Sequence, residues 1–443
     1  MESGKRLINL TRSKVTGDSA WVTAGFATNA FSSLFVSILL ARLFSENNVA
    51  IYFLFFSMVI VLSAITQVGL NVTVVKVLNK PKYIEFRLAY LIKMIFIILA
   101  SNIFLSAIII LTPSDFFTEI ITIDQNINQY LYIVLFWVLF FSLRSYLSEV
   151  FRGFHDIKRA ALYQRILPNI LLMLFLTIVY IFQLNIELHT LLISIVFINF
   201  FLICISLPRL MAYLKVLTYK PGVQFTHILA SGGPIVMGQS IQFLITQSPI
   251  WILTIVSTLE SVADYGVATR LAAVVSIPLL IANNVIMPKI AKLFGDENIA
   301  IINKTLNVSV IASSSLSLIV TIILVINGEW LLFLLFGEEY LLAYDLLIIL
   351  CIGNLINVVS GSPAVVLAMA GFENYVMYSS FLAGILTISI CFSIIPTYGA
   401  VGAAIAASIG ISVLNLVLVL FCYKLTDAKT YLQMPSMIAN KRA

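Results

Sequence analysis

The chain has 443 residues, of which 61% are hydrophobic and only 10% are charged, with a formal net charge of +6. Its mean hydropathy is +1.05. A soluble globular chain is about 45–50% apolar and about 25% charged. The composition therefore excludes an ordinary soluble domain and favours a chain that folds in a bilayer.

Long apolar runs recur along the whole chain. A helix needs about 20 apolar residues to cross a hydrocarbon core of roughly 30 Å, and continuous runs such as LYIVLFWVLFFSL favour helices over the alternating strands of a barrel. The pattern predicts an all-α membrane protein with about 12 transmembrane helices and no cleaved leader. The twelve stretches lie near 20–43, 49–75, 87–112, 129–151, 160–182, 188–208, 228–257, 263–287, 305–327, 343–369, 375–395 and 400–423.

Basic residues gather at the two termini and in alternate loops, whereas the other loops are acidic. Cytoplasmic loops carry the excess of Lys and Arg, so both termini are predicted to be cytoplasmic. This topology explains the basic residues better than a nucleic-acid surface does, because the loops are short and flank membrane helices. The basic groups hold 22 of the 26 Lys and Arg residues: Lys5, Arg6, Arg12, Lys14; Lys76, Lys80, Lys82, Arg87; Arg152, Lys158, Arg159, Arg165; Arg209, Lys215, Lys220; Lys289, Lys292, Lys304; and Lys424, Lys429, Lys441, Arg442.

Cysteine and histidine residues are few and scattered. The four cysteines sit in apolar runs and the three histidines lie far apart, so neither a disulfide, a metal site nor a nucleophilic triad is predicted. We therefore predict no cofactor, no metal and no enzyme.

Two short motifs occur twice at nearly the same separation. Val-Ala-x-Tyr begins at Val49 after the first predicted helix and at Val262 after the seventh, an offset of 213 positions. Gly-Phe at Gly153 and Gly371 gives an offset of 218 positions. These repeats favour an internal duplication over chance. Because each half has an even number of helices, the halves would be related by an axis along the membrane normal. We predict six-helix bundles at 1–208 and 228–443, joined by a cytoplasmic linker at 209–227.

Several stretches resemble a known family over essentially the whole chain. They are LLARLFSENNVAIYF, LFGEEYLLAYDLLIIL, VVLAMAGFEN and PTYGAVGAAIAASIG. In order and spacing they are similar to the polysaccharide-transporter branch of the multidrug/oligosaccharidyl-lipid/polysaccharide (MOP) exporter superfamily.

The resemblance implies two six-helix bundles forming a V around a central cavity, and a Wzx-type flippase. Such a protein moves an undecaprenyl-diphosphate-linked oligosaccharide from the inner to the outer leaflet of the bacterial inner membrane. The product feeds O-antigen (lipopolysaccharide), capsule or a related polymer. Expected partners are that lipid-linked glycan, membrane lipids and the polysaccharide polymerase machinery, and no nucleic acid.

Four cations remain outside the basic loops and are candidate substrate contacts. Cations inside a membrane usually face a cavity, and Arg suits phosphate. Arg42 at the end of its helix could equally reach the interface or pair with Glu46, whereas Arg270 lies deeper and could pair with Asp264 or Glu260. The other two are Lys93 and Arg144.

Lys93 and Arg144 also have alternatives to a substrate role. Lys93 is close enough to the inner face to reach it, and Arg144 lies near Glu149, although Arg152 at i+3 is a better partner for that carboxylate.

Polar residues in the seventh predicted helix lie beside helix breakers such as Pro234 and Pro249. Amides can bind sugar hydroxyls or neighbouring helices, and the breakers could permit bending. The candidates for lining a cavity are Gln239, Gln242 and Gln247. Further amides inside the membrane are expected to join helices: Asn29, Asn71, Asn283, Asn284, Asn354 and Asn357.

Two other functions compete with the flippase. A multidrug antiporter of the same superfamily often carries a carboxylate in the first or seventh helix, which is absent here. A membrane glycan polymerase usually has a large basic outer loop, but the longest outer loop here, near 113–128, is short and acidic.

Overall fold

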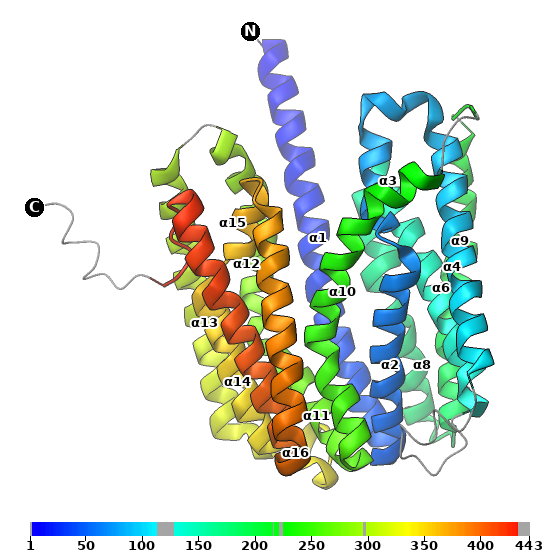
Figure 1. Ribbon diagram of the computed structural model, residues 1–443, viewed down its shortest axis with the longest axis vertical. Helices are drawn as coiled ribbons and strands as arrows, with labels where there is room; N and C mark the ends of the chain where they lie inside the picture. The colour runs from blue at the N-terminus through cyan, green and yellow to red at the C-terminus, as the bar shows by residue number, and fades with distance from the viewer. Residues whose placement is uncertain (1, 113–127, 216, 221–224, 296–297, 433–443) are drawn as a thin grey trace, which may run out of the picture. The chain divides into compact units, whose positions relative to one another are not determined.

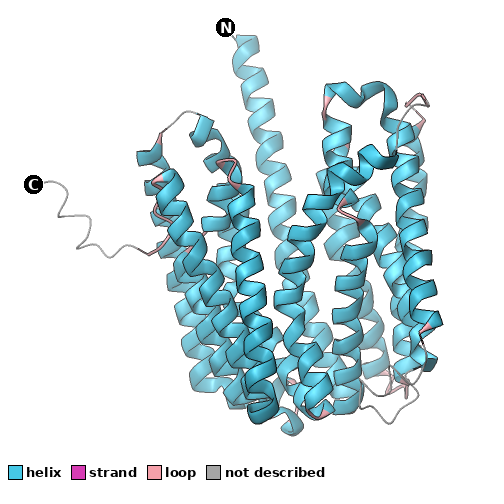
Figure 2. Cartoon of the chain, viewed as in Figure 1, coloured by secondary structure: helices cyan, strands magenta, loops and turns pink. Residues whose placement is uncertain are grey.

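A computed structural model of the protein is built from helices, and no strand occurs among the residues it describes, which are 2–112, 128–215, 217–220, 225–295 and 298–432 (Figures 1 and 2). The chain forms two compact units, residues 1–247 and 248–443, named unit 1 and unit 2 below. The division falls inside one helix, after Gln247. The predicted linker at 209–227 stays a prediction, since residues 216 and 221–224 lie outside the described ones.

Unit 1 contains the helices of the first half of the chain and most of α10. They are α1 Glu2–Leu43, α2 Glu46–Gln67, α3 Leu70–Asn79, η1 Pro81–Phe86, α4 Arg87–Leu111, α6 Asn128–Gly153, α7 Ile157–Ala161, η2 Leu162–Ile166, α8 Leu167–Ile181, α9 Leu188–Leu214 and α10 Phe225–Val256. Unit 2 contains α11 Leu259–Ala272, η3 Ala273–Ser276, α12 Ile277–Gly295, α13 Ile299–Leu335, η4 Glu338–Tyr340, α14 Ala343–Ser360, α15 Pro363–Met369 and α16 Glu373–Thr426.

The helices account for the twelve predicted membrane spans. Within the described part of the chain, ten helical segments are long and apolar enough to cross a membrane. One of the ten, Glu373–Thr426, covers two predicted spans, and α10 matches the predicted stretch at 228–257. The prediction of an all-α, multi-pass membrane protein is therefore confirmed.

α16 is a hairpin of two helices. A straight helix of its 54 residues would be about 80 Å long, more than twice the hydrocarbon core. Gly399 near its middle has φ 53° and ψ −131°, which is not helical. Residues on either side meet: the rings of Tyr375 and Phe421 lie 5.1 Å apart between centroids, and a Cβ on Gly402 would lie 2.9 Å from the carbonyl oxygen of Ile394. The two arms appear side by side in orange and red in Figure 1.

The second predicted helix, 49–75, is wrong in one respect, because the structure divides it into α2 and α3. Val68 and Gly69 both adopt the left-handed conformation, with φ 48° and 66°. Left-handed residues cannot continue a right-handed helix. Gly69 was the sign of this break in the sequence, since glycine adopts the left-handed conformation readily, whereas the β-branched side chain of Val68 rarely does.

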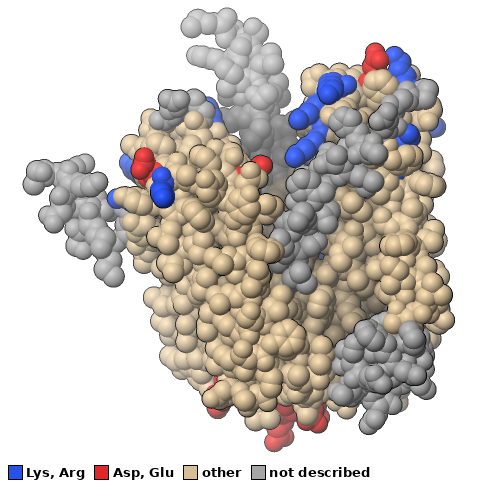
Figure 3. Space-filling view, viewed as in Figure 1, with Lys and Arg blue, Asp and Glu red and all other residues tan. Residues whose placement is uncertain are grey.

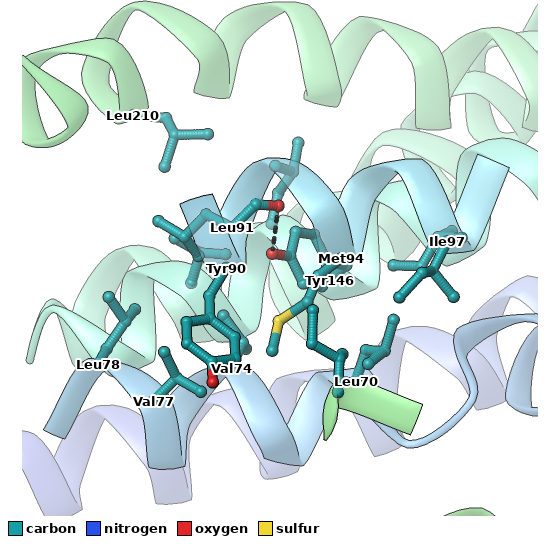
Figure 4. Packing of buried hydrophobic residues seen from close by; sticks show 14 of the residues in the cluster. Leu70, Val74, Val77, Leu78, Tyr90, Leu91, Met94, Ile97, Tyr146 and Leu210 are labelled. Atoms are coloured by element: carbon teal, nitrogen blue, oxygen red, sulfur yellow. Dashed lines mark hydrogen bonds between the residues drawn. The ribbon is translucent and has the colours of Figure 1, made fainter. Parts of the chain in front are cut away.

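A buried apolar cluster holds α3, α4 and α6 together in unit 1 (Figure 4). Leu70, Val74 and Met94 are fully buried in it. Tyr146 of α6 is also fully buried, and its hydroxyl donates to the Leu91 carbonyl of α4 at 3.2 Å. Dispersion contacts and this hydrogen bond fix the register of α4 on α6.

The two units share a packing order, which supports the predicted duplication. In unit 1, α6 packs against α2, α4 and α9, and in unit 2, α14 packs against α11, α13 and α16. The repeated Val-Ala-x-Tyr starts at Val49 in α2 and Val262 in α11, each three residues after the first helical residue, and both valines are buried.

Intramembrane amides join helices within each unit, as predicted for four of them. Nδ2 of Asn169 donates to Oδ1 of Asn29 at 2.9 Å, joining α8 to α1. In unit 2, three pairs join neighbouring helices: Ser276 with Asn354, Asn415 with Asn357, and Ser362 with Asn283. Oδ1 of Asn71 accepts from the Val72 N–H at 2.9 Å, and Nδ2 of Asn284 donates to the Leu280 carbonyl of its own helix at 2.8 Å.

Charge is distributed as the loops predicted. On the face drawn in Figure 3, Lys and Arg appear at one end of unit 1 and at one end of unit 2, with a few acidic side chains among them, and further acidic side chains lie at the other end of unit 2. The membrane side that each end faces remains a prediction.

Candidate functional site

A cation lies in a helical segment of unit 1 that is long and apolar enough to cross a membrane. Helices α7, η2 and α8 form one continuous span, Ile157–Ile181, with a π-helical turn at Leu162–Ile166. Arg165 lies in this turn, and its guanidinium carbon is 3.7 Å from the centre of the Phe26 ring of α1. A guanidinium over an aromatic face is attracted by the ring quadrupole. Phe26 therefore helps to hold the charge in place inside the span.

The sequence analysis placed Arg165 within the predicted stretch 160–182 but counted it with the basic residues of the preceding loop, and so did not make it a candidate contact. The signal was the start of the helix: Asp156 is a helix cap whose Oδ1 accepts from the Arg159 N–H at 3.2 Å. An Asp before a helical run marks the first turn. Placing the helix start there would have put Arg165 more than two turns inside it.

Next to the π-helical turn, a buried carboxylate is held by two partners. Glu149 of α6 is 7% exposed, and its Oε1 lies 3.0 Å from Nη1 of Arg152, the i+3 pair that the sequence predicted. Gln164 donates to the same oxygen at 2.9 Å and accepts from Nη2 of Arg152 at 3.0 Å. Arg152 neutralises the carboxylate, and this attraction offsets part of the free-energy cost of removing Glu149 from water. The buried pair as a whole is not strongly stabilising.

Arg144 is 5% exposed and makes several hydrogen bonds inside unit 1. Its Nε donates to Oδ1 of Asn199 at 2.7 Å, joining α6 to α9. Its Nη1 donates to the carbonyls of Tyr163 and Gln164 at 2.6 and 2.9 Å. A π-helical turn shifts the backbone hydrogen bonds and leaves carbonyls available to such donors. These contacts give Arg144 a positioning role, and its contact with an anion stays a prediction.

The remaining candidates of unit 1 lie on several helices. Lys93 is half-buried in α4, with Nζ 4.6 Å from the centre of the Phe225 ring of α10. In α10, Gln242 is exposed and Gln247 is half-buried, donating to Oγ1 of Thr246 at 3.3 Å. The side chain of Gln239 lies outside the described ones.

The two remaining arginines lie at helix ends. Arg42 is exposed in the last turn of α1. Arg270 is half-buried in the last turn of α11, directly before the 3₁₀ turn η3 within the span Leu259–Met287. A cation at the end of a helix is favoured by the helix dipole. Arg270 belongs to unit 2 and is described separately from the cations of unit 1.

None of these groups forms a metal centre: in the residues that the structure describes, no three His, Cys, Asp or Glu side chains gather as ligands. What unit 1 offers is a guanidinium positioned within a membrane span, beside a paired carboxylate and an amide. Such groups can contact an anionic, hydroxyl-rich head group.

A family model described as "Polysaccharide biosynthesis protein" matches residues 16–294, more than half of the chain. The chain belongs to this family. A comparison of this chain with curated protein sequences found no match.

Solved structures show which fold this member of the polysaccharide biosynthesis family adopts. "Lipid II flippase MurJ, inward closed conformation" is 15% identical, with a TM-score of 0.69, covering 90% of this chain and 86% of that one. A MATE multidrug transporter, DinF-BH in complex with R6G, is 14% identical, with a TM-score of 0.67 and coverages of 93% and 95%. An inward-facing MATE family transporter of the MOP superfamily is 14% identical, with a TM-score of 0.68, covering 90% of this chain and 94% of that one.

These similarities confirm the predicted MOP fold. The similar structures are a flippase and multidrug transporters.

Proposed function

We propose that the protein is a flippase for a lipid-linked oligosaccharide. The cargo is an undecaprenyl-diphosphate-linked repeat unit, which alternating access moves from the inner to the outer leaflet of the bacterial inner membrane. The product serves O-antigen, capsule or related polysaccharide synthesis, and the polymerase machinery is the expected partner on the outer side. Both termini face the cytoplasm in this orientation.

The observation that carries the proposal is Arg165 inside the span Ile157–Ile181, in a chain of the polysaccharide biosynthesis family. A diphosphate and its sugars cannot cross hydrocarbon unaided, and an Arg inside a membrane is costly unless it serves a polar path. The guanidinium is suited to a phosphate oxygen. Phe26 at 3.7 Å stabilises that charge while no cargo is bound.

Arg270 and Lys93 are further proposed contacts of the diphosphate, Arg42 is a proposed contact of the cargo at the far end of α1, and Gln239, Gln242 and Gln247 are proposed contacts of the sugars. Arg144 contributes to the same path by positioning the π-helical turn through its bonds to the Tyr163 and Gln164 carbonyls.

Leaflet sidedness of the cargo tests this function. In a strain that lacks the gene, lipid-linked oligosaccharide should accumulate in spheroplasts where an added lectin or glycosidase cannot reach it. The wild-type gene should restore access, whereas Arg165→Ala and Arg270→Ala should not. Loss of one charge-assisted contact, about 1.5–3 kcal/mol, corresponds to about a 10- to 150-fold loss of affinity.

The matched control is Lys220→Ala, which removes a basic residue from an exposed pair with Glu85 at 2.8 Å. An exposed ion pair contributes little to stability, so access should be restored in full. Unchanged access after deletion of the gene would refute the flippase.

A second function, multidrug antiport, is favoured by one specific observation. Glu149 is a carboxylate buried within the span Tyr130–Gly153, and antiporters need a group that exchanges a cation. Its pairing with Arg152 at 3.0 Å weakens this alternative, because a neutralised carboxylate binds a second cation less well. If the protein were an antiporter, Glu149→Gln would abolish drug efflux that overexpression of the wild type confers. No efflux with the wild type would dismiss this alternative.

A further inference from the structure

A surface pocket opens at the end of unit 1 opposite its basic loops. It lies where α1 and α8 end and α9 begins, and it has a volume of about 820 Å³. Small-molecule pockets are typically about 300–1,000 Å³, so this one has the size of a ligand site. It is distinct from the Arg165 region, which lies at the other end of α8.

The polar groups of the pocket come from two distant parts of the chain. Arg42 lines it from α1 and Tyr180 from the last turn of α8, and the α8–α9 connection contributes Gln183, Asn185 and Glu187. Within the described part of the chain, none of the hydrogen bonds uses the side chains of Gln183, Asn185 or Glu187. These side chains are exposed and can therefore turn toward a ligand.

We propose that this pocket binds the sugar part of the transported lipid on the outer side. The proposal rests on the proposed function and gives the flippase a second site, for the glycan rather than the diphosphate.

The mixture of groups selects the sugar. A hydroxyl both donates and accepts hydrogen bonds, and the pocket offers both: Arg42 donates, Glu187 accepts, and the amides of Gln183 and Asn185 do both. A diphosphate only accepts, and Glu187 would repel it. The ring of Tyr180, which is 52% exposed, presents an apolar face with a polar tip and can pack against the carbon face of a sugar ring.

The backbone of the connection holds Gln183 in an unusual conformation. It ends α8 in the left-handed conformation, with φ 49°, while the Leu184 N–H donates to the Val179 carbonyl at 3.0 Å. Glycine is the usual residue at such a helix end, since any side chain is strained there. This conformation fixes where the Gln183 side chain leaves the end of α8, at the pocket that it lines.

Gln183→Gly separates function from folding, because it removes the amide and also relieves the strain. The variant should melt at the wild-type temperature or higher, yet bind the glycan less well. The matched control is Asp427→Gly in unit 2. Asp427 is also left-handed, with φ 53°, but it is no part of the pocket, so its replacement should leave binding unchanged.

The probes are the undecaprenyl-diphosphate-linked repeat unit, purified from a strain lacking the gene, and undecaprenyl diphosphate without sugars. Each is titrated into the full chain in nanodiscs. Wild type should bind the glycosylated lipid more tightly. Gln183→Gly, Asn185→Ala and Tyr180→Leu should each reduce that preference about 3- to 10-fold, the range for a lost neutral hydrogen bond. Their affinity for the bare lipid should not change.

Each outcome has a separate meaning. Equal wild-type affinity for both lipids, or variants that keep the full preference, would overturn the glycan pocket and leave the flippase intact. Variants that weaken both lipids alike would also overturn it, since the contacts would then not be to the sugar. If wild type binds neither lipid, the proposed function fails together with the pocket.

Discussion

The hairpin of α16 can be tested by filling the space at one glycine. A Cβ on Gly410 would lie 2.1 Å from Oγ1 of Thr387, which belongs to the other arm. If α16 were a straight helix, 23 residues would separate the two sites by about 35 Å. Gly410→Ala and Thr387→Ala should therefore interact strongly in the hairpin and not at all in a straight helix.

The expected magnitudes follow from the packing. Overfilling a core costs about 1–3 kcal/mol, and Ala offsets about 1 kcal/mol of this because it favours the helix over Gly. Thr387 is fully buried and its hydroxyl donates to the Ala383 carbonyl at 2.7 Å, so Thr387→Ala should cost about 1–2 kcal/mol. In the double variant the new methyl group occupies the space that Thr387 leaves. The double variant should be at least about 1 kcal/mol more stable than the sum of the single changes.

The assay is denaturant unfolding of the purified protein in detergent micelles, arranged as a double-mutant cycle. Gly353 provides the control, because a Cβ there would lie 2.8 Å from the backbone Cα of Ser408. Ser408→Ala cannot remove a backbone atom, so Gly353→Ala should stay destabilised by about 1–3 kcal/mol in both backgrounds. If the Gly410 and Thr387 effects add within about 0.5 kcal/mol, the packing of the hairpin described above is wrong.

Two further stability predictions concern unit 1. Tyr146→Phe removes the buried hydroxyl that donates to the Leu91 carbonyl at 3.2 Å, so the free energy of unfolding should fall by about 0.5–1.5 kcal/mol in the same denaturant assay; no change would mean that this bond does not help to fix α4 on α6. Arg144→Leu leaves Oδ1 of Asn199 without its donor at 2.7 Å and should cost about 1–3 kcal/mol. Adding Asn199→Leu should recover part of this loss, and no recovery would contradict the proposed positioning role.

The number and type of the elements followed from local composition. Apolar runs of about twenty residues must form helices in a bilayer, because only internal hydrogen bonds can satisfy the backbone there. The same reasoning placed Pro396 and Gly399 between two spans, and the structure has its turn at Gly399. The break at Val68 was missed, since no breaking residue precedes Gly69 and tertiary packing overrides the preference of a valine.

The candidate site was only partly predictable. The Glu149–Arg152 pair was foreseen from its i+3 spacing, which is a local property of a helix. The contact of Arg165 with Phe26 was not, because its residues lie far apart in the sequence and meet only through the packing of η2 on α1. For Arg144 the sequence offered a substrate or the nearby Glu149 as a partner, whereas the structure shows it bonded to two carbonyls of a π-helical turn.

The sequence by itself determined three properties of this protein. It crosses a membrane with about twelve helices, it resembles one known family, and its charged residues are rare within the apolar stretches. Those properties depend on composition along the chain and on helix length. The tertiary structure alone decided which polar groups share a place, as Arg42 and Asn185 do in one pocket. Helical periodicity gives the face of a residue on its own helix, but it carries no information on which other helix lies opposite that face.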